Sequence, residues 1–424
     1  MSHSVLTFIT KVKPDKVAEL NQLLAEIADN LLEQSHLPFP RLKLLHFASL
    51  FLSDDPNYGA TLVFENNFDG PLDPYLDELY RHAADGLQRI YSCCVDYPAR
   101  SAADREQMLS YLRAHVVRPN AYHIGNPGRS AARIAQEAQL RDLLENTADT
   151  LTCGDRPRLP AHELRQRLQD AVSSQPDFSW AASFQPRLSR AEQIIPMLKF
   201  RGTIVLAGLI VLLFWQVMIP LILLYLAVLW WKERHDLVWR GVAKHDHVGK
   251  LTQREDRTHT FQNHMASFAL VKPGRFRRLT LWAVLWFVNL KARTAIHGEL
   301  SGIPSIHFAH WSIIDGGRRL LFVSNFDGSW ENYLDDFIDK ASPGLTAIWS
   351  NTVNFPRTRF LIFGGARDGS RFKADARAYQ VYTNVWYSAY RDLTVQSIDA
   401  NSAIREGLSQ PLEPADVQTW LHRF

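Results

Sequence analysis

Two histidines in one short apolar stretch are the first residues of this sequence that suggest chemistry. The stretch covers residues 306–311 and contains His307 and His310. Side chains alternate between the two faces of a sheet along a strand, so these histidines are expected to face opposite ways. An imidazole on an open sheet face can act as a general base or as a haem ligand. The alternative is a histidine that only makes hydrogen bonds within a packed interface.

A second candidate is the sequence Asn-Phe-Asp-Gly, which occurs at residues 67–70 and again at residues 325–328. Asp69 and Asp327 could exchange protons with a ligand at the mouth of a cavity. The same residues also suit a turn in which Asp bonds nearby backbone, Gly has a positive φ and Phe fills the core. Retention of the sequence in both places favours this structural role.

A third set occurs only in the second half of the chain and mixes aromatic, amide and guanidinium side chains. Such a set can line a pocket for a flat or anionic ligand, and it can equally pack as a junction between two modules. Its members are Trp349, Asn351, Arg357, Arg359, Trp386, Tyr387 and Tyr390.

From these sets we predict catalytic and ligand-binding residues. The catalytic candidates are His307 as ligand or base, Asp327 as an acid–base group and Arg359 as the partner of an anionic group. We predict no metal site beyond this set, because the remaining histidines lack a fixed ligand spacing. The ligand-binding candidates are His310, Trp349, Asn351, Arg357, Trp386 and Tyr387.

These residues belong to a pattern that occurs twice. Residues 61–98 and 319–356 align without a gap, with an offset of 327 − 69 = 258. Each copy reads strand, helix, strand, strand, helix, the opening of a βαββαβ module whose helices cover one sheet face. In the first copy the expected elements are strands 4–10, 42–52 and 60–65 and helices 17–32 and 73–91. The predicted fold class is therefore α+β, with two ferredoxin-like modules paired within one chain.

The predicted domains follow from the two copies. The first module covers residues 3–146, a linker covers 147–262, the second module covers 263–410 and a tail covers 411–424. The linker holds a predicted helix at 162–172 and the uncharged apolar stretch 203–231. A run of this length is typical of a transmembrane segment.

The basic residues on both sides of the stretch favour two ends on the same side of a membrane. We predict a hairpin bent near residues 218–220, where Pro220 interrupts the helix, with arms too short to cross the bilayer. A tilted single span is the alternative. The helix predicted at residues 275–290 carries Trp282 and Trp286 behind a basic start, as interfacial helices do. An ordinary core helix would explain the same residues.

The overall composition is ordinary for a globular protein of 424 residues, with 21% charged and 46% hydrophobic residues. The net charge of +3 is too small to indicate nucleic acid as a partner. We expect Cys93, Cys94 and Cys153 to be reduced thiols. No signal peptide is apparent, so we expect both modules to face the cytoplasm from the inner membrane.

The duplicated pattern resembles the dimeric α/β-barrel superfamily of ferredoxin-like modules, and within it a bacterial membrane-anchored branch. The resemblance covers residues 3–146 and 263–410. The superfamily includes small monooxygenases, chlorite-dismutase-like haem proteins and dye-decolourising peroxidases. The peroxidases carry a GxxDG motif whose Asp works over the haem, and residues 323–328 place Asp327 at that position without the leading Gly.

The resemblance implies a membrane-anchored oxidoreductase-like protein that acts on a hydrophobic small molecule, with haem as a cofactor and Arg359 as a propionate partner. The alternative is a non-catalytic, membrane-attached scaffold or ligand-binding protein. In either case membrane lipid is an expected partner.

Overall fold

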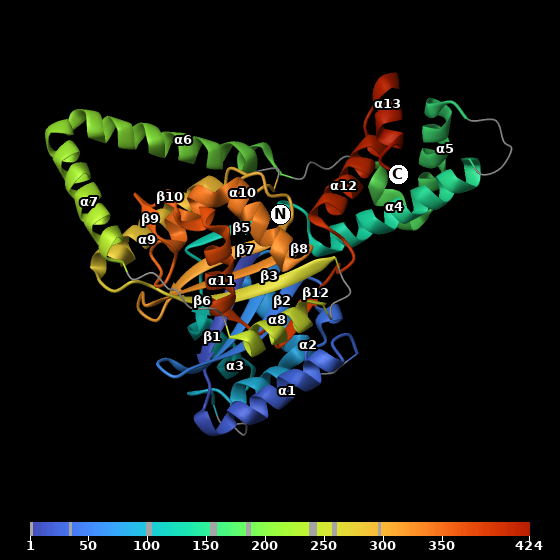
Figure 1. The fold of residues 1–424 in the computed structure, drawn as a ribbon. Helices are drawn as coiled ribbons and strands as arrows, with labels where there is room; N and C mark the ends of the chain where they lie inside the picture. Colours follow the sequence, from blue (N-terminus) through green and yellow to red (C-terminus); the bar gives the residue numbers. More distant parts are fainter. Residues whose placement is uncertain are drawn as a thin grey trace.

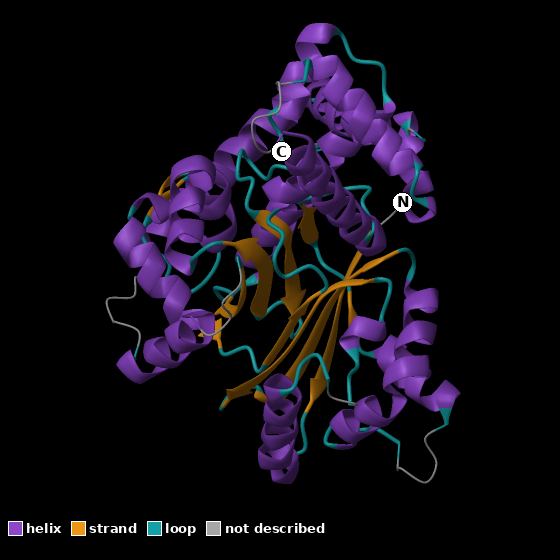
Figure 2. Ribbon diagram, turned by 90° about the vertical axis from the view of Figure 1, so that its right-hand side faces the viewer, coloured by secondary structure: helices purple, strands orange, loops and turns teal. Residues whose placement is uncertain are grey.

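Two five-stranded antiparallel sheets form the centre of the protein in a computed structural model, and helices lie outside them (Figures 1 and 2). The structure describes residues 3–33, 36–98, 104–152, 159–183, 188–236, 244–256, 261–295 and 298–424. Cys153, one of the three predicted thiols, lies outside these ranges. The other two, Cys93 and Cys94, are buried and unpaired by a disulfide.

The first sheet has the strand order β12-β2-β3-β1-β4, and the second has the order β11-β6-β8-β7-β5. The strands are β1 (His3–Lys11), β2 (Leu45–Asp55), β3 (Gly59–Asp69), β4 (Val116–Val117), β5 (Ala121–Ile124), β6 (Gln262–Leu270), β7 (Ile306–Ile314), β8 (Arg319–Asp327), β11 (Gln380–Val381) and β12 (Val385–Ser388). Each sheet therefore takes one edge strand from the other half of the chain. β12 pairs with β2, and β5 pairs with β7.

The central strands are buried on both faces, as the alternation of β3 shows. Leu62 and Phe64 pack against the helices of the first sheet, whereas Val63 packs against Leu321 and Val323 of the second sheet. One face of each sheet thus meets helices and the other face meets the opposite sheet. Because both faces lose contact with water, consecutive residues of β3 such as Leu62, Val63 and Phe64 are all apolar.

Three helices cover the outer face of each sheet. On the first sheet these are α1 (Val17–Asp29), α2 (Leu72–Ser92) and α3 (Arg105–Ala114); on the second they are α9 (Arg275–Ala292), α10 (Trp330–Trp349) and α11 (Gly369–Tyr379). The predicted helix 17–32 is right in its start and ends at Asp29. Ser329 caps α10 by accepting a hydrogen bond from the Asn332 N–H, at 3.2 Å.

A separate helical cluster lies at one end of the body. It consists of α4 (Ala131–Thr152), α5 (Ala161–Ser173), α12 (Val395–Ser409) and α13 (Pro414–Leu421). Leu140, Leu168 and Trp420 are buried together in its core. The helix predicted at residues 162–172 is confirmed as α5. α8 (His245–Asp256) lies beside β11, where the His247 ring bonds the carbonyl of Gln380 at 2.9 Å.

The apolar linker stretch forms two helices, α6 (Arg190–Leu213) and α7 (Trp215–His235), which together make an arm that projects from the body (Figure 1). Both helices, of 24 and 21 residues, are long and apolar enough to cross a membrane, so the prediction of arms too short to cross is wrong for the length of the helices themselves. The chain bends at Phe214, where φ is −114° and ψ is 30°. The predicted bend at residues 218–220 is therefore wrong: Pro220 lies inside α7. A proline disturbs the turn that precedes it, because its ring meets the carbonyl four residues earlier.

A short two-stranded ribbon completes the second half of the chain, formed by β9 (Thr358–Arg359) and β10 (Phe363–Gly364). The α+β class, the antiparallel sheets and the two apolar helices are confirmed. The Asn-Phe-Asp residues end strands β3 and β8 instead of forming turns, whereas Gly70 and Gly328 have the expected positive φ of 80° and 83°.

Candidate functional site

The structure brings His307 and Asp327 together. His307 on β7 places its Nε2 atom 2.7 Å from Oδ1 of Asp327 at the end of β8. The other carboxylate oxygen, Oδ2, accepts the backbone N–H of Val395 at 2.8 Å, where α12 begins. A carboxylate is stabilised at a helix N-terminus by free N–H groups and by the helix dipole. Asp327 therefore connects two strands of one sheet to a helix.

The first half of the chain repeats this arrangement. His46 Nε2 lies 3.0 Å from Oδ1 of Asp69, and Oδ2 of Asp69 accepts the N–H of Ala131 at 2.9 Å, where α4 begins. The hydroxyl of Tyr390, at 2.9 Å, contacts Nδ1 of His46. Burial alone raises the pKa of Asp69, but hydrogen bonds from His3 and His46 outweigh it and hold the pKa well below its ordinary value.

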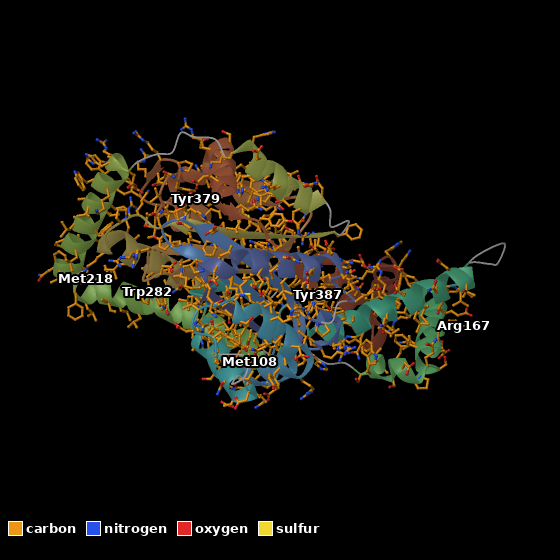
Figure 3. The ribbon with its side chains drawn as sticks, turned by 90° about the horizontal axis from the view of Figure 1, so that it is seen from below. Met108, Arg167, Met218, Trp282, Tyr379 and Tyr387 are labelled. Carbon is orange, nitrogen blue, oxygen red and sulfur yellow. The ribbon has the colours of Figure 1, made fainter. Side chains whose placement is uncertain are left out.

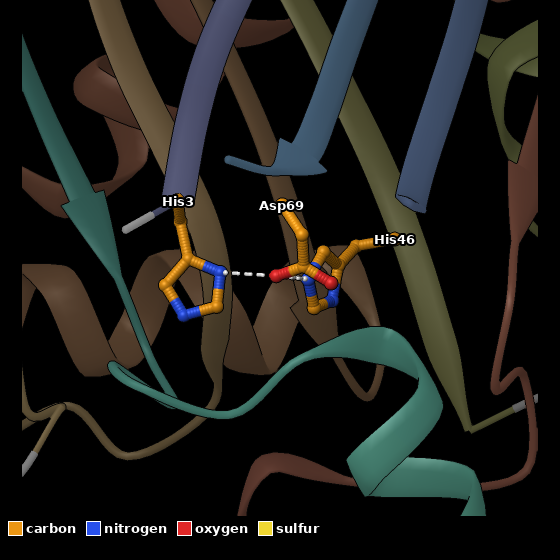
Figure 4. Close-up of side chains that lie close together, drawn as sticks. All are labelled: His3, His46 and Asp69. Atoms are coloured by element: carbon orange, nitrogen blue, oxygen red, sulfur yellow. Dashed lines mark hydrogen bonds and ion pairs between the residues drawn. The ribbon is translucent and has the colours of Figure 1, made fainter. Parts of the chain in front are cut away.

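His3 completes a group of two imidazoles around the Asp69 carboxylate (Figure 4). Its Nδ1 atom lies 3.1 Å from Oδ1 of Asp69. Among the described residues, His3, His46 and Asp69 form the one group whose ligand atoms are close enough to hold a metal ion. Two histidines and a carboxylate are a known ligand set for iron, so this group requires a test of fit.

The protons of the group fit hydrogen bonds better than a metal. The backbone N–H of Gly128 donates to Nε2 of His3 at 3.0 Å, which places the ring proton on Nδ1, facing Asp69. A metal at Nδ1 would move that proton to Nε2, against the Gly128 N–H. In the second copy the position of His3 is occupied by Gln262, since His3 pairs with Asp69 and Gln262 with Asp327. The shared part is the His–Asp–helix connection.

A buried carboxylate lies between the two sheets. Glu65 accepts a hydrogen bond from Ser49 at 2.9 Å, from Asn325 at 3.3 Å and from Asn67. His264 places its Nε2 atom 3.8 Å from Glu65 Oε2. Burial raises the pKa of Glu65, but His264 and the other donors outweigh it, so the net pKa is lowered. Glu65 is thus an anion held by donors from both sheets.

His310 faces the same space, with its Nε2 atom 3.0 Å from the hydroxyl of Thr7. Burial lowers the pKa of His310 to about 4, so the ring is neutral at pH 7. Trp386 donates from Nε1 to Asn325 at 2.8 Å. Two of the six predicted ligand-binding residues therefore meet in the polar centre between the sheets.

The other predicted residues lie elsewhere. Trp349 packs edge-on against Trp311 and Phe322 in the core of the second sheet. Asn351 donates to the carbonyl of Ala347, at 2.9 Å, where α10 ends. These two residues stabilise the fold at the positions they occupy.

Tyr387 stacks on Phe39 in the core of the first sheet. Arg357 and Arg359 lie at the exposed ribbon β9–β10, with the Arg359 guanidinium over Phe363. The predicted set is therefore divided among the inter-sheet centre, the two cores and the ribbon.

The pair His307–Asp327 borders an open cleft of about 570 Å³, which Asp327 lines. Four carboxylates line the cleft: Glu255, Asp256, Asp327 and Asp336. Asp327 is 11% exposed there, whereas Asp69 is only 2% exposed. The two copies thus differ in access, and only the second offers a carboxylate edge to a ligand.

A separate feature of the second copy is a buried acid on the inner face of α11. Asp375 is 2% exposed and borders a cavity of about 20 Å³, room for about one water molecule, between the second sheet and α10–α11. Its Oδ1 atom has no hydrogen-bond partner. Burial raises the pKa of Asp375 from 3.8 to about 7, partly offset by Lys272.

Comparison with the first copy explains this cavity. After the core stretch the two copies align again with an offset of 384 − 120 = 264, as Asn120 with Asn384, so Tyr111 of the first copy corresponds to Asp375. Phe8 pairs with Phe64 in the first sheet as Ser267 pairs with Phe322 in the second, so Phe8 corresponds to Ser267. Tyr111 and Phe8 belong to the filled core of the first sheet. The second copy has two smaller, polar side chains at these positions.

The surroundings of His307 do not fit a haem. The ring is 1% exposed and packs against Phe47 and Tyr390, with ring centroids 5.1 and 5.9 Å away. Its Nε2 atom is engaged by Asp327, whereas its Nδ1 atom has no hydrogen-bond partner. An iron porphyrin at Nδ1 would need a flat space beside the ring, and the flanks of this buried ring are filled by the aromatic side chains.

Sequence reasoning missed His3, Glu65 and Asp375. His3 could have been found from the repeat, because it aligns with Gln262 at the strand position opposite Asp69. Glu65 aligns with Val323 and Asp375 aligns with Tyr111 in the other copy. An acidic residue in one copy at a position that is uncharged in the other was therefore the signal that could have found them. Comparisons with protein-family models, with curated proteins and with solved structures find no match for this chain.

Proposed function

We propose that the protein is a membrane-attached ligand-binding protein, built from two paired ferredoxin-like modules that lie on one side of the membrane. The observation that carries the proposal is the exposed apolar arm. No residue of the apolar window in α6 is buried, and only 6% of the window in α7 is. Apolar surface of this extent is costly in water and is typical of membrane contact.

The arm is fastened to the second module where α7 ends. Buried Glu233 accepts hydrogen bonds from the hydroxyl of Thr358 and from the backbone N–H groups of Phe360 and Leu361, at 2.7–3.0 Å. Asp236 accepts from Lys272 at 2.7 Å and from Arg277 at 2.6 Å. These contacts fix the direction in which α7 leaves the body, as an anchor that positions a protein requires.

The exchanged strands support a same-side arrangement. β5 precedes the arm in the chain and pairs with the second sheet, whereas β12 follows the arm and pairs with the first sheet. Neither pairing can form across a bilayer, so the chain has to return to the side from which it entered. We propose the cytoplasmic side of the inner membrane, because basic residues flank both ends of the arm.

The cleft beside Asp327 is the proposed ligand site. Its carboxylates, together with Asn263, Asn332 and Ser329, suit a small molecule that carries hydrogen-bond donors or a positive charge. A ligand with an apolar part could reach this cleft from the membrane to which the body is attached.

An oxidoreductase-like enzyme is the second candidate, and one observation favours it. Asp327 presents a carboxylate edge to the cleft while His307 holds it from behind, which is the arrangement of an oriented acid–base group. In this version Asp327 moves a proton to or from the ligand. His307 orients the carboxylate.

Removing the arm tests the proposed attachment. In the full chain, replacement of residues 203–231 by a short Gly–Ser linker is expected to move the protein from the membrane pellet to the soluble fraction. The reason is that the variant lacks the apolar surface whose insertion keeps the protein in the membrane during an alkaline carbonate wash. A second variant, Leu209→Lys with Leu213→Lys, keeps the chain length and is expected to weaken attachment in the same direction.

Substitution of Leu32 by Ser is the matched control. Leu32 is an apolar residue that is 53% exposed, and it lies in the turn that follows α1, outside the arm. This control should stay in the pellet. Near-ultraviolet circular dichroism verifies that each variant is folded. An arm-deleted protein that is folded and still pellets with carbonate-washed membranes would refute the proposal.

A further inference from the structure

Helix α9 exposes an apolar face that its own module leaves uncovered. Leu279, Trp282, Trp286 and Phe287 are 67%, 55%, 47% and 45% exposed. On the opposite side of the helix, Leu281 and Leu285 are fully buried against the second sheet. The inner residues are sufficient to hold α9 in place, so the outer ones are not explained by the fold.

The exposed face of α9 adjoins the arm at both ends. Phe276 near its start stacks on Tyr225 of α7, with ring centroids 5.2 Å apart, and the Thr280 hydroxyl lies 3.3 Å from that of Tyr225. Towards its end, the Phe287 ring lies 5.9 Å from Phe200 of α6. Figure 3 shows Trp282 and Met218 towards the same end of the molecule. The helices α6, α7 and α9 therefore share one apolar surface.

The contacts with α9 set how far the arm can project. Beyond Phe200 and Tyr225, the free part of the arm is residues 201–224, with its bend at Phe214. Its limbs hold 13 and 11 residues, roughly 16–20 Å at 1.5 Å per residue. The hydrocarbon core is about 30 Å thick, so the limbs are deep enough for one leaflet and too short for two.

The charges around this surface have one sign. Between Lys199 and Arg234, and along α9, every exposed ionisable side chain is basic; Glu233 in that interval is buried. The exposed members are Lys199, Arg201, Arg234, Arg275, Arg278 and Lys291. Basic side chains beside inserted apolar residues attract anionic lipid headgroups, and tryptophan prefers the boundary between headgroups and acyl chains.

We propose that α9 is a second membrane-contacting element, which lies in the headgroup layer of a bilayer containing anionic phospholipid while the arm enters only that leaflet. This inference rests on the proposed membrane attachment and adds its geometry and lipid class. A protein partner could cover only α9, because lipid surrounds the adjoining arm. A bilayer can cover the arm and α9 together, so it is the simpler occupant of the shared apolar surface.

Lipid photo-crosslinking of the full chain tests the proposal. The protein is reconstituted into vesicles of phosphatidylcholine and phosphatidylglycerol (3:1) that contain a diazirine lipid, with the diazirine either at the headgroup or in the middle of the acyl chain. Labelled peptides are identified by mass spectrometry. The headgroup probe is expected to label the α9 peptide, and the acyl-chain probe is expected to label the arm near Phe214.

Two double variants test which residues of α9 are responsible for its labelling. Labelling of the α9 peptide should fall about fivefold or more in Trp282→Ser with Trp286→Ser, and separately in Arg278→Gln with Lys291→Gln. The same fall is expected for the unaltered protein in vesicles of phosphatidylcholine alone. Arm labelling should be unchanged in every case. The matched control, Leu32→Ser, should change neither.

The outcomes separate the two proposals. Strong arm labelling with an unlabelled α9 peptide would overturn the role of α9 and leave the attachment intact. Absence of labelling in both segments would overturn the attachment itself. Labelling of the tip at Phe214 by a water-soluble reagent enclosed in the vesicle lumen would overturn the one-leaflet geometry.

Discussion

Replacing Asp69 with Ala is expected to lower the free energy of unfolding by about 3–5 kcal/mol, the cost of leaving buried charged or polar partners without their acceptor. Asp69 is 2% exposed and faces three donors: the rings of His3 and His46 and the N–H of Ala131. Urea unfolding followed by tryptophan fluorescence measures the change.

The matched control is His3→Gln, which introduces the residue found at this position in the second copy. It is expected to cost about 1–2 kcal/mol, because the ring contacts of His3 with Asp69 and with the Gly128 N–H are lost while the His46–Asp69–Ala131 connection remains. A metal centre predicts instead that the two substitutions are about equally costly, because each removes one ligand. If His3→Gln cost as much as Asp69→Ala, and a chelator destabilised the unaltered protein equally, the hydrogen-bonded interpretation would be wrong.

The stabilisation by Asp69 also has a definite pH dependence. Its folded pKa lies below the ordinary value of 3.8, so the folded protein binds fewer protons there than the unfolded chain. The contribution is therefore complete at neutral pH and is lost as the pH falls below about 4.

Replacing Asp375 with Asn is expected to stabilise the protein at pH 8, unlike the replacement of Asp69. The expected gain in the free energy of unfolding is about 2–4 kcal/mol, because the pKa of Asp375 is raised by roughly three units in the folded state. Burial raises the pKa of this carboxyl from 3.8 to about 7. The folded state therefore binds more protons than the unfolded state between these values, and stability falls as the pH rises. The loss begins near pH 4 and is complete above pH 7.

The Asn variant removes this dependence, so the two proteins should be about equally stable at pH 4 and should diverge towards pH 8. Urea unfolding at intervals between pH 4 and pH 8 measures it. Asp339→Asn is the control, since Asp339 is exposed on the neighbouring helix α10. Parallel pH profiles for the unaltered protein and the Asp375→Asn variant would contradict the burial of an ionisable acid in this cavity.

The sequence predicted most of the local structure because the pattern of β3 and α2 returns in β8 and α10 at one offset. It also singled out His307 and Asp327, because both copies keep these residues, but the contact between them comes from the structure. It could not predict that β5 and β12 change sheets. Each of these strands has only four residues, and their pairing is decided by contacts more than 180 residues away in the chain.

The candidate site was harder to predict where a residue type serves both ligand binding and core packing. Arg359, Trp349 and Tyr387 have side chains suited to a ligand, yet one stacks at an exposed ribbon and two fill hydrophobic cores. Composition alone cannot separate these uses, because aromatic residues serve cores and pockets equally well. Haem at His307 stays a prediction from resemblance, and the packing of that ring does not support it.

The sidedness of the two modules is the most direct measurement of the proposed architecture. Single cysteines at Gln22 on α1 and Asp339 on α10, both exposed, are placed in a Cys153→Ser background and treated with a membrane-impermeant maleimide. Exchanged strands and a hairpin arm predict that both sites react in inside-out vesicles and that neither reacts in intact cells. Labelling of the two sites from opposite sides of the membrane would contradict the paired, same-side arrangement.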